Sequence, residues 1–166
     1  MPSATIRERI MKVLKTTLEG ITVTNGYANT IPAGGVQRFT QSGQVYNKSI
    51  VIVIHEGTDE PTEGPLAGAQ SLTTRKLDVA LEVVTRHDES ADARSSEEIV
   101  NTLRGDVEKA LMSNPTWKEG ATDLALKTFP PSFTPIFAFE GQRDLTFIAE
   151  CTVQYRHRRT DPTALV

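Results

Sequence analysis

The residues of this sequence best suited to chemistry are two carboxylates, Asp78 and Glu82, in the segment 73–86 (TTRKLDVALEVVTR). Paired carboxylic acids can serve as general acid and base when both flank one bond. Apolar residues alternate in this segment, so a strand would place the two carboxylates on one face, about 13 Å apart. That separation exceeds either carboxylate spacing used in glycoside hydrolysis. We therefore interpret Asp78 and Glu82 as polar strand positions that meet basic residues on a neighbouring strand or subunit.

Metal-dependent catalysis requires ligands at defined spacings, and the sequence lacks them. No two histidines have HxH or HxxxH spacing, and a single cysteine cannot supply a set of thiolates. The acid–x–Lys pattern of nuclease cores does not follow Asp78 or Glu82, and phosphate-binding glycine motifs and GxSxG are absent. We expect no catalytic residue, no metal and no cofactor. We interpret the histidines as solvated strand ends: His55, His87 and His157.

Two further features near the C-terminus, a cysteine and a basic cluster, do not indicate catalysis. Cys151 lies in an alternating apolar run, so we expect a small core residue rather than a nucleophile. A lone cysteine also excludes an internal disulfide and is typical of a reducing compartment. The basic cluster of Arg156, Arg158 and Arg159 fits either a solvated, exposed tail over 156–166 or a contact with an acidic partner or nucleic acid. A net charge of −3 argues against general nucleic-acid binding.

The length and the apolar runs bound the class of protein. A chain of 166 residues can bury about two thirds of its unfolded surface in one domain. We expect that domain over 1–159, with a C-terminal tail over 160–166. Residues 1–8 lack the apolar core of a signal peptide, and the longest apolar run, Ile50–Ile54, is too short to cross a bilayer. We therefore expect a cytosolic product.

Two segments have helical periodicity. Apolar residues recur on one face over 5–19, and Thr5 with Glu8 matches a capping box. The segment 95–112 has the same period, begins with a capping box at Ser95, and ends before Pro115. Gly105 lies inside this second helix at a cost of about 1 kcal/mol relative to alanine, so we expect close packing there.

Strand periodicity occurs in the remaining parts. The segment 49–55 (SIVIVIH) is apolar on both faces, which predicts an interior strand covered by helices on both sides, or by another subunit on one. The segment 73–86 predicts a central strand, 133–155 predicts an antiparallel hairpin, and 21–24 predicts a short strand. The acidic, Pro- and Gly-bearing segment 56–71 predicts a long loop that is poorly ordered in an isolated subunit.

This order of elements predicts an α+β fold: a mostly antiparallel (mixed) sheet of four to six strands packed with two amphipathic helices. It also resembles a known family. The resemblance spans residues 4–159 and is carried by the helix RERIMKVL, an I-x-V strand, SIVIVIHEG with its acidic loop, KLDVALEVVTR, the helix EEIVNTLRGDVEKAL and the final strand TFIAECTVQYRHRR. In these features the chain resembles the tail terminator (tail completion, minor tail) proteins of long-tailed bacteriophages.

The resemblance implies a structural virion protein without enzymatic activity. Such proteins form a homohexameric ring that caps the tail tube, terminates tail polymerisation and prepares the tail for head joining. The implied partners are further copies of the chain, the tail tube protein and the head–tail connector or neck protein. No membrane is implied, and no nucleic acid beyond the DNA that passes through the ring. The implied location is the head-proximal end of the virion tail, and the host cytoplasm during assembly.

Nine charged residues are then candidates for contacts with a neighbouring subunit or the tube. They lie on the central strand, in the acidic segment and in the basic cluster: Asp78, Glu82, Arg86, Glu56, Asp59, Glu60, Arg156, Arg158 and Arg159. Two alternative functions stay open. One is a head–tail connector or neck protein, and the other is a small phage nuclease or other metal-dependent enzyme.

Overall fold

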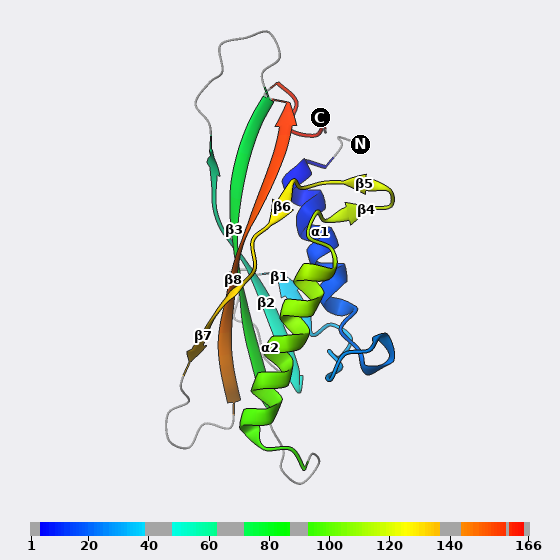
Figure 1. Ribbon diagram of the computed structural model, residues 1–166, viewed down its shortest axis with the longest axis vertical. Coiled ribbons are helices and arrows are strands. Elements are labelled where there is room, and N and C mark those ends of the chain that lie inside the picture. Colours follow the sequence, from blue (N-terminus) through cyan, green and yellow to red (C-terminus); the bar gives the residue numbers. More distant parts are fainter. Residues whose placement is uncertain are drawn as a thin grey trace.

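The computed structural model describes residues 4–38, 48–62, 72–86, 93–136, 144–158 and 160–164. These residues form two helices, one 3-10 turn and eight strands (Figure 1). In chain order they are α1 (Ile6–Glu19), η1 (Val23–Asn25), β1 (Val36–Arg38), β2 (Ile50–Pro61), β3 (Leu72–Arg86), α2 (Ser96–Ser113), β4 (Lys118–Glu119), β5 (Thr122–Asp123), β6 (Lys127–Thr128), β7 (Ser132–Ile136) and β8 (Asp144–Arg158).

The long strand β3 is the centre of the main sheet. It pairs antiparallel with β2 on one side and with β8 on the other, where the register runs from Leu72 opposite Arg158 to Arg86 opposite Asp144. Strand β1 adds to β2 in the parallel direction, whereas β6 and β7 pair antiparallel with β8. The six-stranded mixed sheet, the small β4–β5 hairpin and the two helices confirm the α+β prediction.

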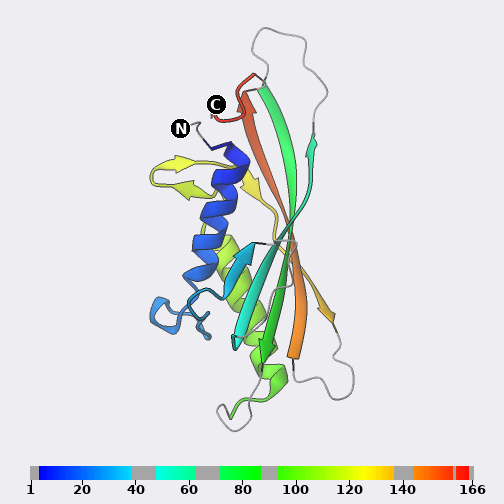
Figure 2. The ribbon, with the colours of Figure 1, turned by 180° about the vertical axis from the view of Figure 1, so that it is seen from behind.

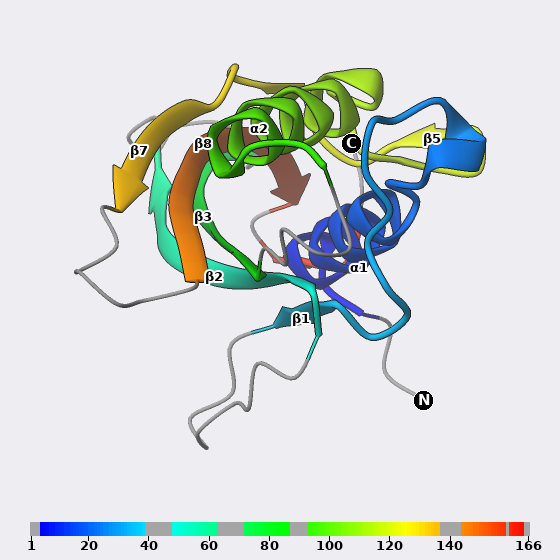
Figure 3. The same ribbon diagram turned by 90° about the horizontal axis from the view of Figure 1, so that it is seen from below.

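Both helices lie against one face of this sheet (Figure 3). Helix α1 lies nearer β1 and α2 nearer β8, as the view from behind also shows (Figure 2). The predicted helix starts are confirmed: Thr5 accepts a hydrogen bond from the Glu8 amide, and Ser95 forms a complete capping box with Glu98. The apolar stripes of the helices pack against one apolar side of β3, formed by Leu77, Val79, Leu81 and Val83.

Strand β2 is buried on both faces within this one chain. Ile52 and Ile54 belong to the core under the helices and are fully buried. Val51 and Val53 face the other way and are each only 1% exposed. The prediction of an interior strand with two buried faces is therefore confirmed. The predicted cover, helices on both faces or another subunit on one, is wrong, because both helices lie on one face and Val51 and Val53 are already buried within this one chain.

The prediction of a loop over 56–71 was wrong for its first part. Strand β2 continues through Pro61, and its pairing with β3 changes register between Glu56 and Asp59. This is a β-bulge, in which an extra residue breaks the two-residue period by which a strand is predicted from sequence. A Cβ atom at Gly57 would lie 3.1 Å from the Asp78 carbonyl oxygen, so a residue without a side chain suits the bulge. Residues 63–71 lie outside the described part.

Other local predictions were also wrong. The segment 21–24 forms the turn η1 rather than a strand, because Thr22 caps it and Gly26 adopts a left-handed φ of 82°. At Gly105, an added Cβ would meet nothing within 4 Å, so no close packing occurs there. The predicted exposed tail begins too early: β8 includes Arg158, and the Ile6 amide donates to the Pro162 carbonyl at 3.0 Å.

Candidate functional site on the outer face of the sheet

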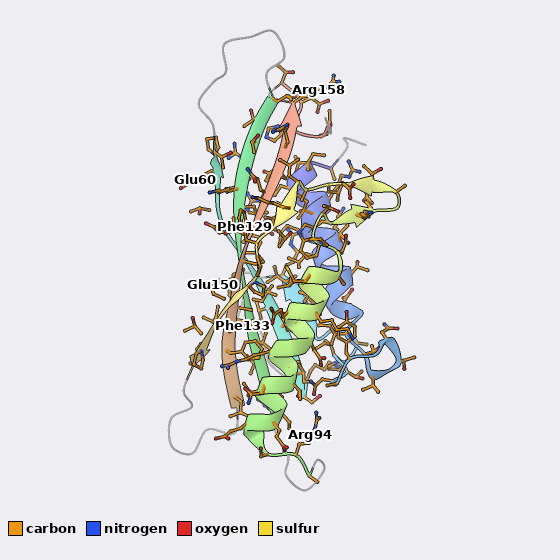
Figure 4. The ribbon with its side chains drawn as sticks, in the orientation of Figure 1. Glu60, Arg94, Phe129, Phe133, Glu150 and Arg158 are labelled. Carbon is orange, nitrogen blue, oxygen red and sulfur yellow. The ribbon has the colours of Figure 1, made fainter. Side chains whose placement is uncertain are left out.

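The candidate site is the face of the sheet that carries no helix, called the outer face from here on. On β3 it is formed by the residues that alternate with the core: Lys76, Asp78, Ala80 and Glu82. The strand alternation therefore places both predicted carboxylates on one face, as expected. Figure 4 shows Glu60, Phe129 and Glu150 on this side, away from the helices.

Asp78 is held by hydroxyl groups from both neighbouring strands. Thr58 on β2 and Thr152 on β8 each donate a hydrogen bond to one of its carboxylate oxygens, both at 2.8 Å. Thr152 is the direct cross-strand partner of Asp78, whereas Thr58 reaches it from the bulge. These bonds fix the orientation of the carboxylate and join three strands.

Glu82 has a different partner, His55 on β2. One carboxylate oxygen lies 3.0 Å from His55 Nε2, and both side chains are about one third exposed. Glu82 lies directly opposite Val53, so it reaches His55 diagonally along the strand. The prediction that these carboxylates meet basic residues on a neighbouring strand fits Glu82, whose partner is an imidazole, and not Asp78, whose partners in the sheet are hydroxyl groups. The two carboxylates therefore belong to two separate hydrogen-bonded groups.

A groove crosses the outer face at Asp78. Two adjoining depressions share Thr58, Asp78, Phe129 and Thr152, and we call them together the sheet groove. One end is lined by Glu60 and Lys76, and the other by Ser132 and Glu150. The phenyl ring of Phe129 is 37% exposed, and Lys127 Nζ lies 4.4 Å from its centroid. The groove thus combines carboxylates with an aromatic surface that attracts a cation.

Two of the predicted interface residues, Glu56 and Asp59, lie on the helix side instead. Glu56 pairs with Arg7 of α1 at 3.0 Å and with Arg38 of β1. Asp59 accepts from Arg75 Nε at 2.7 Å and lies 3.8 Å from an Arg7 nitrogen. Glu56 continues the alternation of Ile52 and Ile54 and lies opposite the core residue Val79. The bulge reverses the facing of the strand after it, so that Asp59 lies opposite the core residue Leu77.

Both carboxylate oxygens of Glu8 accept a hydrogen bond from an Arg38 terminal nitrogen at 2.9 Å. Together with Glu8, these side chains form what we call the ionic cluster. Its formal charges balance, since three arginines face three carboxylates from α1, β1, β2 and β3: Arg7, Arg38, Arg75, Glu8, Glu56 and Asp59. The side chains are partly buried, so their pairing is screened less than at a free surface. The cluster connects the first turn of α1 to β1 and to the parts of β2 and β3 beside the bulge.

The remaining predicted residues lie at or near the ends of three different strands. Glu60 is exposed on β2 and Arg86 is exposed at the end of β3. Arg156 donates from Nε to Thr74 Oγ1 at 3.1 Å, so it belongs to the sheet rather than to a tail. The backbone of Arg158, the last residue of β8, forms an isolated antiparallel β-bridge with that of Asp161. Arg159 lies outside the described residues.

Among the described residues, no three His, Cys, Asp or Glu side chains are grouped so that they could hold a metal ion. His87 lies outside that part of the chain. Within the same ranges, neither helix is long and apolar enough to cross a membrane.

Cys151 belongs to the core on the helix side of β8, opposite Val79, and is 6% exposed. Burial, together with the nearby Asp78 charge, raises the pKa of its thiol to about 12. A thiol with such a pKa stays protonated at neutral pH and is a poor nucleophile. The predicted role as a small core residue is confirmed by its burial.

The sequence reading did not single out the arginines of the ionic cluster or Tyr155. Their partners, Glu56 and Asp59, lie in the segment 56–71 that the sequence predicts as a loop, so the sequence predicts no strand pairing for them. A continuation of β2 through Gly57 with one residue skipped would have placed both acids on the core side. Glycine among acidic and β-branched residues is the signal for such a bulge.

No protein-family model matches the chain, and no curated protein matches it.

Proposed function

We propose that this protein is a structural subunit of a bacteriophage tail, a terminator that forms a ring on the end of the tail tube. The observation that carries the proposal is the order and arrangement of the elements. An N-terminal helix, two long strands, a second helix and a final hairpin build one sheet with both helices on the same face. This order resembles that of tail terminator proteins, and it leaves the outer face without a helix.

A role in assembly also agrees with the chemistry of the outer face. Asp78 and Glu82 are each engaged with neighbouring strands, which suits a rigid, patterned surface. A ring built from identical copies uses two different patches of each subunit, and charge complementarity aligns them. In this proposal the ring stops the polymerisation of the tube and offers its other side for head joining.

The oligomeric state tests the proposal first. We expect a hexamer in sedimentation velocity and in negative-stain images, either for the isolated protein or after addition of tail tubes. A protein that stays monomeric with and without tubes would contradict it. DNA cleavage in the presence of Mg²⁺, lost in Asp78→Ala and Glu82→Ala, would instead support an enzyme.

A phage that lacks the gene distinguishes a terminator from a head–tail connector. Overlong tails are expected if the protein terminates polymerisation. Tails of normal length that fail to join heads would identify a connector or neck protein. Complementation with the wild-type gene is the control for both outcomes.

A further inference from the structure

The sheet groove and the outward side of α1 carry opposite charges. The sheet groove is lined by three carboxylates, those of Glu60, Asp78 and Glu150, and by the ammonium group of Lys76, with the Lys127 ammonium beside it over the Phe129 ring. Glu60 and Glu150 are exposed. Asp78 is held in place by two hydroxyl donors, so the negative charge at the middle of the groove has a fixed position.

The outward side of α1 is basic. Arg9, Lys12 and Lys15 recur every three residues there, and we call them the helix stripe. Arg9 bonds to Glu119 of the β4–β5 hairpin and Lys15 to Glu19, while Lys12 is exposed and forms no ion pair among the described residues. Helix α1 as a whole has four basic and two acidic side chains.

Exposed apolar side chains occur on the same two sides. Phe129 and Ile136, which are 37% and 45% exposed, lie on the β6–β7 side. Val23 is 61% exposed in η1, directly after α1. In Figure 1, the end of β7 and the blue segment after α1 lie on opposite sides of the molecule at a similar level along its long axis. Large apolar side chains left in water are a common feature of protein interfaces.

The two charged patches are also at the same level. Figure 4 shows Glu60, Phe129 and Glu150 on one side of the sheet, and α1 spans the same part of the long axis on the other side. Patches on opposite sides of a subunit can meet in a head-to-tail contact, which closes into a ring when each copy is rotated relative to the last. Acidic would then meet basic, and apolar would meet apolar, in every contact.

We propose that the sheet groove of one copy receives the helix stripe of the next copy, with Lys12 placed between Glu60 and Glu150. This inference rests on the proposed ring and adds the two surfaces that meet in it. The occupant of the groove is a second copy of this chain, because α1 supplies the complementary charge on the side where a ring neighbour must lie.

Charge reversal on each side tests this pairing. We expect Lys12→Glu, and separately Glu60→Lys with Glu150→Lys, each to raise the dissociation constant of the assembly at least about tenfold, because attraction is replaced by repulsion. A chain that carries all three substitutions restores attraction between position 12 and positions 60 and 150, while Asp78 stays acidic, so assembly should recover in part. Sedimentation velocity measures all of these variants.

Two controls separate the pairing from a general effect of charge. Glu108→Lys on the exposed side of α2 and Lys48→Glu before β2 make the same changes outside both surfaces, and each should assemble like the wild type. Circular dichroism and thermal melting of each variant must match the wild type. Should a reversal variant fail to fold, Lys12→Gln and Glu60→Gln with Glu150→Gln serve instead, with smaller expected effects in the same direction.

The outcomes distinguish this inference from the proposed function. A ring that is insensitive to both reversals, or that is not restored in the triple variant, would overturn the groove–helix pairing and leave the ring itself standing. A wild-type protein that never assembles, even on tail tubes, would overturn both. Binding of the groove to a cationic segment of another protein, with assembly unchanged by the reversals, would likewise reject a second copy as the occupant.

Discussion

The Tyr155 hydroxyl donates a hydrogen bond to Asp59 Oδ2 across 2.8 Å, although their strands β8 and β2 do not pair with each other. Arg75, on the strand between them, donates to the other carboxylate oxygen. Asp59 therefore joins three strands just after the bulge. Burial, and then the bond to Asp59, raise the pKa of Tyr155 far above its usual value, so the phenol remains a donor.

This relationship predicts a cooperative loss of stability. Tyr155→Phe should lower the free energy of unfolding by about 1 kcal/mol, the typical net value of one hydrogen bond. Asp59→Ala should cost more, about 3 kcal/mol, because it removes the carboxylate that pairs with the partly buried Arg75 and accepts from Tyr155, while Arg7 keeps Glu56. Urea denaturation measures both. The double variant should lose less than the sum of the two single losses, and strict additivity would contradict a direct coupling.

Asp106 predicts a second stability effect at the loop after η1. Its carboxylate is 5% exposed and accepts from the backbone amides of Ala28 and Asn29, at 2.9 and 2.8 Å, and from Asn29 Nδ2. Asp106→Ala should cost about 2–3 kcal/mol, because these donors lose a charged acceptor. Thermal or urea unfolding tests this. Glu108→Ala, on the exposed side of the same helix, is the matched control and should change little.

Two glycines should respond oppositely to alanine. A Cβ at Gly35 would lie 2.8 Å from the Pro32 carbonyl oxygen and 2.9 Å from the Ile50 carbonyl oxygen, so Gly35→Ala should destabilise the fold. A Cβ at Gly105 meets nothing within 4 Å on an exposed helix position, so Gly105→Ala should stabilise by about 1 kcal/mol. Melting temperatures that shift in the same direction for both would refute this.

The buried thiol predicts a loss of stability in alkali. The folded protein keeps the proton of Cys151 up to a pKa of about 12, whereas an unfolded thiol releases it near pH 8.5. The unfolded state therefore binds fewer protons above pH 8.5, and the free energy of unfolding falls as pH rises. The raised pKa of Tyr155 adds to the fall at still higher pH.

Denaturation at several pH values measures this slope. Cys151→Ala should flatten the fall between about pH 8.5 and pH 10, whatever its effect on stability at neutral pH. The thiol should also react with a disulfide reagent far more slowly in the folded protein than in urea. Equal rates in the two states would show that the cysteine is accessible.

Much of this fold could be predicted locally. Residues close together in the sequence determine the period of the two helices and their caps at Thr5 and Ser95. The same holds for the alternation over 73–86. Such patterns decide which face of an element is apolar, and hence that helices and sheet must bury each other. The same alternation placed Asp78 and Glu82 on one face of the central strand.

What each charged residue contacts was decided by tertiary structure. Thr152 is 74 residues from Asp78, and it reaches that carboxylate only because β8 pairs with β3 in one register. Glu56 follows the alternation of Ile52 and Ile54 to the helix side, where it meets Arg7. The bulge after it turns Asp59 to the same side, beside Arg75, and places Glu60 on the outer face. Side-chain facing has a period of two, so one inserted residue reverses it, and that insertion depends on how two distant strands fit together.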